Sequence, residues 1–314
     1  MLNSLFALLA ALSLAPAPSI GIHPMQMYGL SVPVEPQLVR VAEVDVAEKI
    51  NLPPNKKDLN DLGIKHSGKS AFVADVKSAG VLYAYKAHDV RSIASLTKLM
   101  TALVVLESEV GLEGDITLVR EDFDRESRAV LRIGDTIPRK DALRALMVGS
   151  VNELGNAFAR TSGMTRAEFI EKMNKKAGEL DLDSLHFVDP TGLDEENKGS
   201  AADIAALLTV AIRKAEIRDA MQESSLILTT KVAWQYTIDT TNLLMFSYLN
   251  KAPYRIIGAK TGSLPTTGYN LAQVTRNGDG DEVVTVLLGS NNHFARYDDV
   301  KALTAWVFDA YTWR

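Results

Sequence analysis

The chain has 314 residues, of which 46% are hydrophobic and 23% charged, so it can bury a substantial core and is not a disordered protein. Its formal net charge of -5 argues against a protein that binds nucleic acid through many phosphate contacts. Cysteine is absent, which excludes thiolate catalysis, disulfides and cysteine-ligated zinc.

The N-terminal segment has the composition of an export signal. Residues 5–19, LFALLAALSLAPAPS, are a short apolar run followed by small residues and prolines. The run is shorter than the ~20 residues that span a bilayer, and APA at 15–17 would serve as a cleavage site. No Lys or Arg precedes it, so a mis-assigned start or an N-terminal helix is the alternative. We predict a signal peptide over residues 1–19 and an exported protein, periplasmic or extracellular.

A proline-rich segment follows. Seven of the 11 prolines lie before residue 55, which disfavours continuous helix or sheet. We predict an extended connector over residues 20–66, with one short strand at 38–46, and a folded domain over residues 67–314.

The segment Gly63 to Ser70, GIKHSGKS, matches the pattern of a phosphate-binding loop. Such a loop needs a strand before it and a helix after it, so that backbone N–H groups converge on the phosphate. Here a polar stretch precedes the segment and an alternating, strand-like stretch follows. A nucleotide-binding protein is therefore the disfavoured alternative.

The folded domain is predicted to begin and end with strands. Residues 70–76 and 80–87 alternate around a turn and predict a hairpin. Helices are predicted over 95–108, 139–150, 152–163, 165–180 and 200–214, with Ser200 and Asp203 placed to cap the last of these. Strands follow over 254–263, 268–276 and 282–290, the last two joined by the turn NGDGD, and an amphipathic helix is predicted over 298–313. This order predicts a two-lobed α/β fold, in which one antiparallel sheet from the N- and C-terminal parts carries an inserted helical lobe.

A serine and a lysine mark the start of the first predicted helix. Ser95 and Lys98, in SIASLTK, are three residues apart and share one helix face. A lysine held in apolar surroundings near a second cation loses proton affinity and can act as a base toward the serine. A capping serine beside a lysine that reaches solvent is the alternative, because S-x-x-K is a weak pattern by itself.

Two further motifs follow in the chain. Ser150 and Asn152 stand in a glycine-punctuated break between helices, and Lys260-Thr261-Gly262 lies on a predicted strand, where the glycine lets a ligand approach closely. The order S-x-x-K, S-x-N and K-T-G on helix, loop and strand is the signature set of penicillin-binding proteins and serine β-lactamases.

Residues 67–313 resemble the low-molecular-mass penicillin-binding proteins, the D-alanyl-D-alanine carboxypeptidases and their endopeptidase relatives. The resemblance extends beyond the three motifs to HFVDPTGLD at 186–194 and TTNLL at 240–244. It implies a β-lactamase/DD-peptidase-like fold and a serine peptidase that needs no metal or other cofactor. It also implies that the substrates are peptidoglycan stem peptides ending in D-Ala-D-Ala, and that β-lactams are covalent inhibitors.

The resemblance also implies a role for each site residue. Ser95 would form the acyl-enzyme, Lys98 would take its proton, and Ser150 would relay a proton to the leaving amine with help from Lys260. Asn152 would bind the substrate amide and Thr261 the terminal carboxylate. The backbone N–H groups of Ser95 and Ser263 would form the oxyanion hole, and Gly262 would leave room for the substrate backbone. Arg296 would orient the carboxylate, with a surface arginine in an ion pair as the alternative.

The sequence departs from the carboxypeptidases in two places. The chain ends at Arg314 without the C-terminal β-domain and amphipathic membrane anchor that these enzymes often carry, which brings it closer to the endopeptidases. The stretch ELGN at 153–156 also replaces the usual small-residue continuation, which puts the far wall of the cleft in doubt. A D-alanyl-D-alanine carboxypeptidase is the principal prediction, with a cross-link endopeptidase as the first alternative.

Other hydrolase classes fit less well. The five histidines have no H-E-x-x-H spacing and no G-x-S-x-G is present, which argues against a zinc peptidase and a Ser-His-Asp hydrolase. A β-lactamase-like hydrolase, the second alternative, would need a carboxylate that activates the deacylating water. The candidates fit solvent-facing loop residues better, and they are Glu153, Asp189, Asp194, Glu195 and Glu196.

Overall fold

The computed structural model describes residues 51–124 and 128–314. The predicted signal peptide, most of the predicted connector and the strand predicted at 38–46 lie outside the described residues. The described residues belong to one compact unit. Of the helices in these ranges, none is long and apolar enough to cross a membrane.

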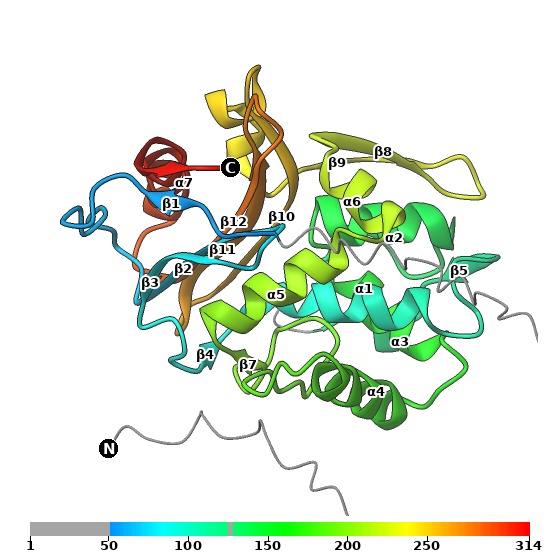
Figure 1. The fold of residues 1–314 in the computed structure, drawn as a ribbon. Coiled ribbons are helices and arrows are strands. Elements are labelled where there is room, and N and C mark those ends of the chain that lie inside the picture. Colours follow the sequence, from blue (N-terminus) through cyan, green and yellow to red (C-terminus); the bar gives the residue numbers. More distant parts are fainter. Residues whose placement is uncertain (1–50, 125–127) are drawn as a thin grey trace, which may run out of the picture. The chain divides into compact units, whose positions relative to one another are not determined.

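One five-stranded antiparallel sheet organises the fold, with strand order β10-β11-β12-β2-β3 (Figure 1). Strands β2 (Ser70–Asp75) and β3 (Val81–Tyr85) come from the N-terminal part. Strands β10 (Arg255–Leu264), β11 (Gly268–Arg276) and β12 (Glu282–Ser290) come from the C-terminal part. The predicted sheet, built from both ends of the domain, is confirmed.

Helices cover both faces of this sheet. Helix α7 (Ala295–Ala310) packs on one face and α5 (Ala201–Ala211) on the other, both against β12 (Figure 1). Strand β12 is therefore buried along nearly all its length, which explains why its sequence is a continuous apolar run and does not alternate.

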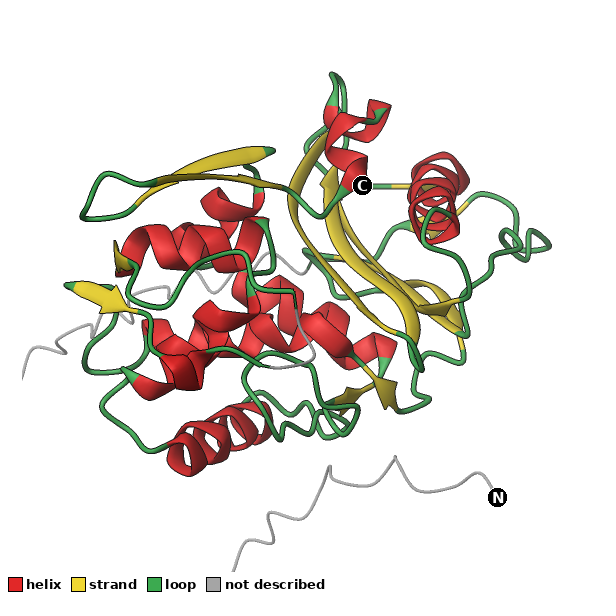
Figure 2. Cartoon of the chain, turned by 180° about the vertical axis from the view of Figure 1, so that it is seen from behind, coloured by secondary structure: helices red, strands yellow, loops and turns green. Residues whose placement is uncertain are grey.

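Most of the segment between β3 and β10 forms the helical lobe, which lies beside the sheet on the α5 side (Figure 1 and Figure 2). Its last part, residues 243–250, packs instead against α7 and β10. Helix α1 (Lys98–Leu106) is at its centre, since every residue from Lys98 to Val105 is buried. The 3-10 helix η1 (Ala94–Thr97) leads into it. The other α-helices are α2 (Arg139–Val148), α3 (Asn152–Arg160), α4 (Arg166–Glu179) and α6 (Ala215–Met221). The two-lobed α/β fold predicted from the sequence is confirmed.

Side chains cap the starts of two helices, and the first of these caps was predicted from the sequence. The Ser200 hydroxyl accepts from the N–H of Asp203 at the start of α5. Thr165 and Glu168 form a reciprocal capping box at the start of α4.

Short paired strands complete the architecture. They are β1 (Asn55–Lys56) with β13 (Tyr311–Thr312), β4 (Arg91–Ser92) with β7 (Lys198–Gly199), β5 (Asp115–Thr117) with β6 (Thr136–Pro138), and β8 (Ser225–Thr229) with β9 (Gln235–Asp239). The β8–β9 hairpin was not predicted, although the burial of β8 alternates residue by residue as expected for a strand with one covered face. Further 3-10 turns are η2 (Arg120–Asp122), η3 (Leu243–Phe246) and η4 (Tyr248–Asn250).

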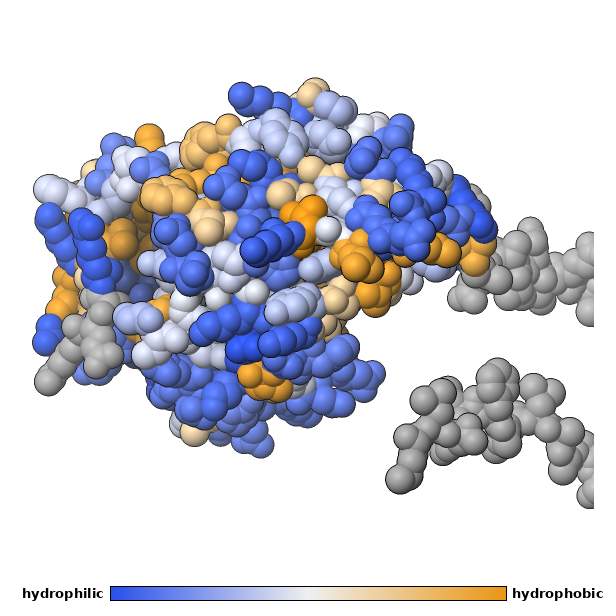
Figure 3. Space-filling view, turned by 90° about the vertical axis from the view of Figure 1, so that its left-hand side faces the viewer, coloured by the Kyte–Doolittle hydropathy of each residue, from blue (hydrophilic) through white to orange (hydrophobic). Residues whose placement is uncertain are grey.

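The structure differs from the prediction at the start of the folded domain. Strand β1 already pairs with β13, and the indole of Trp306 on α7 donates to Asp61 at 2.6 Å. Residues 55–66, predicted as connector, are therefore packed against the C-terminal helix. The phosphate-loop alternative fails as well, because Ser70 begins strand β2 and no helix follows Lys69. Figure 3 shows apolar groups scattered in separate places among hydrophilic ones on the face that it draws, an ordinary mixed protein surface.

Candidate active site

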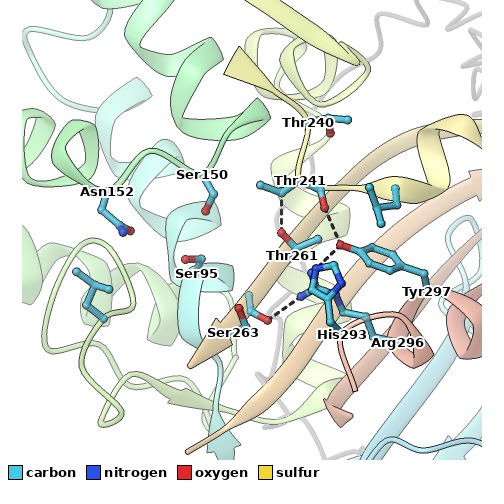
Figure 4. Close-up of a pocket in the computed structure, with 13 residues that line it drawn as sticks. Ser95, Ser150, Asn152, Thr240, Thr241, Thr261, Ser263, His293, Arg296 and Tyr297 are labelled. Carbon is cyan, nitrogen blue, oxygen red and sulfur yellow. Dashed lines mark hydrogen bonds between the residues drawn. The ribbon is translucent and has the colours of Figure 1, made fainter. Parts of the chain in front are cut away.

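A cleft of about 440 Å³ lies between β10 and the helical lobe (Figure 4). It brings together most of the predicted site residues, which come from four separate parts of the chain. The lining residues are Ser95, Ser150, Asn152, Leu193, Thr240, Thr241, Leu243, Thr261, Gly262, Ser263, His293, Arg296 and Tyr297. Lys98 and Lys260 are buried and contact the serines that line the cleft.

The Lys98 ammonium is held by three acceptors. Its Nζ donates to Ser95 Oγ at 2.9 Å, to Asn152 Oδ1 at 2.7 Å and to the Thr191 carbonyl at 2.6 Å. Burial lowers the pKa of Lys98 from 10.5 to about 7, although the carboxylates of Asp189 and Glu153 act in the opposite direction. A large fraction of this amine is therefore neutral near pH 7 and can accept the hydroxyl proton of Ser95.

A second serine and lysine face the first pair. Lys260 Nζ donates to Ser150 Oγ at 2.7 Å and to the Thr261 carbonyl at 3.2 Å. Burial lowers the pKa of Lys260 well below 10.5, and the positive charges of Lys98 and Arg296 lower it further. The cleft thus contains two hydroxyl groups, each in contact with its own buried amine.

The backbone near both serines is in a strained conformation. Ala94 has φ +49° and Ser150 has φ +57°, the left-handed region that non-glycine residues rarely adopt. Such strain is retained only where surrounding contacts enforce it, and it concentrates at functional sites. Ser150 lies in the turn between helices α2 and α3, and this backbone conformation directs its hydroxyl into the cleft.

Two glycines allow close approach to the backbone around Ser95. A Cβ on Gly192 would lie 2.0 Å from the Ala94 carbonyl oxygen, and one on Gly262 would lie 2.8 Å from the Ile93 carbonyl oxygen. Real Cβ atoms do not approach this closely, so neither position has room for a side chain. The glycine of K-T-G is therefore explained by contact with the chain at Ser95, in addition to the predicted access for a ligand.

The Asp189 carboxylate organises the loop that holds Lys98. It accepts five hydrogen bonds from the loop, from the N–H groups of Thr191, Gly192 and Asp194, the Thr191 hydroxyl and the Asn197 amide. These bonds hold its pKa below 3.8 in spite of the burial that opposes them. The carbonyl of Thr191, in the middle of this loop, is an acceptor for Lys98.

The interpretation of Asp189 and Glu153 as solvent-facing loop residues is wrong. Asp189 is 7% exposed and Glu153 1% exposed. Glu153 Oε1 accepts from the backbone N–H groups of Val130 at 2.7 Å and Leu131 at 2.8 Å. Because a buried carboxylate must be satisfied by donors, these two acids serve to fix neighbouring backbone. The ELGN stretch thus begins α3 and secures the loop beside it.

Arg296 is buried, with 4% of its surface exposed, so its interpretation as a surface arginine in an ion pair is wrong. Its Nη1 donates to the carbonyls of Gly262 at 3.2 Å and Asn270 at 3.4 Å, and its Nη2 donates to the Tyr297 hydroxyl at 2.6 Å. The Tyr297 hydroxyl in turn donates to the Thr241 carbonyl. The arginine therefore links the K-T-G end of β10 to β11 and α7.

The structure adds cleft residues that the motifs did not single out, namely Leu193, Thr240, Thr241, Leu243, His293 and Tyr297. Thr261 Oγ1 donates to Thr241 Oγ1 at 2.7 Å, which joins β10 to the TTNLL stretch. That stretch was noted in the sequence only as a resemblance, and nothing in it signals which hydroxyl enters the cleft. Within residues 51–124 and 128–314, no three His, Asp or Glu side chains gather as a metal site.

Known proteins are similar to this chain in sequence and in fold. The family described as D-alanyl-D-alanine carboxypeptidase (Peptidase_S11) matches residues 56–292. A D-alanyl-D-alanine endopeptidase of Escherichia coli K12 is 31% identical over 76% of this chain and 76% of the relative. A D-alanyl-D-alanine endopeptidase of Pseudomonas aeruginosa is 30% identical over 84% of each chain. The crystal structure of the Streptomyces K15 DD-transpeptidase superposes with a TM-score of 0.71, at 28% identity, over 79% of this chain and 99% of that one.

Proposed function

The chain belongs to the D-alanyl-D-alanine carboxypeptidase family of serine peptidases, and from this premise we propose that it hydrolyses peptidoglycan stem peptides through an acyl-enzyme on Ser95. Ser95 is assigned as the nucleophile because its Oγ contacts the buried amine of Lys98, whose pKa lies near 7. Such an amine is matched to proton transfer at neutral pH.

In the proposed reaction, neutral Lys98 takes the hydroxyl proton of Ser95 while Oγ attacks the carbonyl carbon between two D-alanines. The negative charge that develops on the carbonyl oxygen is stabilised by the backbone N–H groups of Ser95 and Ser263. The C–N bond then breaks, and the leaving amine takes a proton through the Ser150 hydroxyl, which is replenished from Lys260. Water then attacks the resulting ester and gives its proton to neutral Lys260 through the Ser150 hydroxyl. As the ester C–O bond breaks, Lys98 returns its proton to Ser95 Oγ, which releases the shortened peptide and restores both amines.

The remaining residues position the substrate in this proposal. The Asn152 side chain is held by Lys98 through its oxygen, which leaves its amide N–H groups to donate to a substrate carbonyl. The Thr261 hydroxyl, turning away from Thr241, donates to the terminal carboxylate. Gly262 gives the peptide access to β10, and the positive charge of Arg296 favours an anion at this end of the cleft.

Intact mass of the protein after incubation with benzylpenicillin tests the nucleophile. We expect an adduct of the full drug mass on the parent and none on Ser95→Ala, while Ser78→Ala, at a serine outside the cleft, retains the adduct. No adduct with intact drug would overturn the acyl-enzyme. No adduct with rapid loss of the drug would instead identify a β-lactamase.

Slow deacylation is expected, because neither buried carboxylate near Lys98 is free to activate water. Glu153 is engaged by two backbone N–H groups and Asp189 by its own loop. The adduct should therefore survive removal of excess drug.

A second candidate function is cleavage of cross-links, which is favoured by the relatives named endopeptidases. An assay on purified muropeptides distinguishes the carboxypeptidase activity from the endopeptidase activity. Loss of one terminal D-alanine from monomeric pentapeptides, with cross-linked dimers left intact, is the result expected of a carboxypeptidase. Conversion of dimers to monomers would assign the endopeptidase activity.

The proposed substrate lies outside the cytoplasm, so we also propose export, with the apolar run at 5–19 as its signal. Fractionation of cells that express the full chain, followed by N-terminal analysis of the product, tests this. A product in the cytoplasm that retains residues 1–19 would overturn it.

A further inference from the structure

His293 lines the cleft, yet the proposed reaction gives it no role. It lies in the turn between β12 and α7, three residues before Arg296, and in Figure 4 its ring stands beside Arg296 and Tyr297 at the end of the cleft that holds Thr261 and Ser263. Within the described residues, neither ring nitrogen has a hydrogen-bond partner, although histidines in folded sites usually have one.

Three aromatic rings pack around His293. The rings of Tyr269, Phe294 and Tyr297 meet it edge-to-face, at centroid distances of 5.5, 4.8 and 5.5 Å. Burial lowers the pKa of His293, and the positive charge of Arg296 lowers it further. The ring is therefore mostly neutral at pH 7 and able to donate one hydrogen bond into the cleft.

An anion bound here would need such a donor. A carboxylate has about four acceptor positions, and Arg296 offers five N–H donors in all. Three of these are already donated to Gly262, Asn270 and Tyr297, and its Nε is buried with no partner among residues 51–124 and 128–314. The Thr261 hydroxyl, turned away from Thr241, adds one donor. Arg296 and Thr261 together thus offer fewer free donors than the four acceptor positions of a carboxylate, so a further donor can bind at one of the positions left.

We propose that His293 recognises the free carboxylate of the leaving residue and so sets the preference of the enzyme for substrates in which that carboxylate is unblocked. This inference rests on the proposed function, because it assigns a role within the same cleft. His293 acts on specificity and takes no part in the proton transfers at Ser95.

Matched thiolesters of an acyl-D-alanine test this inference. One has a leaving thiol that carries a free carboxylate, and the other has the same thiol with its carboxylate as the methyl ester. The activated bond keeps both reactions measurable. We expect the parent to prefer the acid, and His293→Ala to lose about 10-fold to 100-fold in kcat/KM for the acid, the range for a hydrogen bond to a charged group, with little change for the ester.

Two variants sharpen the experiment. His293→Gln, which keeps a donor, should restore part of the preference, and His88→Gln, at an exposed histidine outside the cleft, should leave both rates unchanged. Equal losses of kcat/KM on the acid and the ester in His293→Ala would give the residue a structural role and overturn the inference. A preference for the acid that persists in His293→Ala would overturn it as well. If the parent and Ser95→Ala are equally inactive on both thiolesters, the proposed function itself fails.

Discussion

The pH dependence of Ser95 acylation follows from the buried position of Lys98. Lowering the pKa of this ammonium from 10.5 to about 7 corresponds to roughly 5 kcal/mol of relative destabilisation of its charged form. Only the neutral amine can take the proton of Ser95. We therefore expect the acylation rate constant to rise about tenfold per pH unit below pH 7 and to level off above about pH 8, so that the rate at pH 5 is about one hundredth of the plateau.

Stopped-flow acylation by a chromogenic β-lactam between pH 5 and 9 measures this profile, with tryptophan fluorescence as a check that the protein stays folded. In Glu153→Gln, a negative charge that raises the pKa of Lys98 is lost, so the inflection should move to lower pH. Lys175→Met, at an exposed lysine on α4, should leave the profile unchanged. A flat profile, or a rise that continues to the ordinary pKa of lysine, would refute Lys98 as the base.

Further predictions concern backbone and buried acids. Gly192→Ala should abolish acylation and lower Tm strongly, because its Cβ would collide with Ala94. Gly280 also has a positive φ but has open space around it, so Gly280→Ala should lower the free energy of unfolding by only about 1–2 kcal/mol. Thermal unfolding of the two variants measures the difference. Glu153→Gln should lower the free energy of unfolding by about 1–3 kcal/mol in urea titrations, without shortening the life of the penicilloyl adduct. Faster hydrolysis of the adduct would contradict the role of Glu153 in holding the backbone. Ser150→Gly relieves the left-handed backbone but removes a hydrogen-bond acceptor of the buried Lys260, so its urea midpoint should change little while it turns over peptide far more slowly. Normal turnover would remove Ser150 from the reaction.

The sequence by itself determined the class of fold and identified most of the residues that meet in the cleft. Strands at both ends of the domain and helices between them follow from local periodicity, which a single chain reports directly. Ser95 and Lys98 are three residues apart, so helical geometry alone predicts that they share a face, and their contact at 2.9 Å agrees with this.

Other features were decided only by tertiary packing. The pairing of β1 with β13 joins residues from opposite ends of the domain, and the hydrogen bond from Thr261 to Thr241 joins two distant segments, so no local pattern can report either. The burial of Asp189, Glu153 and Arg296 is likewise invisible in the sequence, where a charged residue is read as solvent-exposed by default. The pKa of Lys98 belongs to this second group, because desolvation depends on what the whole fold places around the amine.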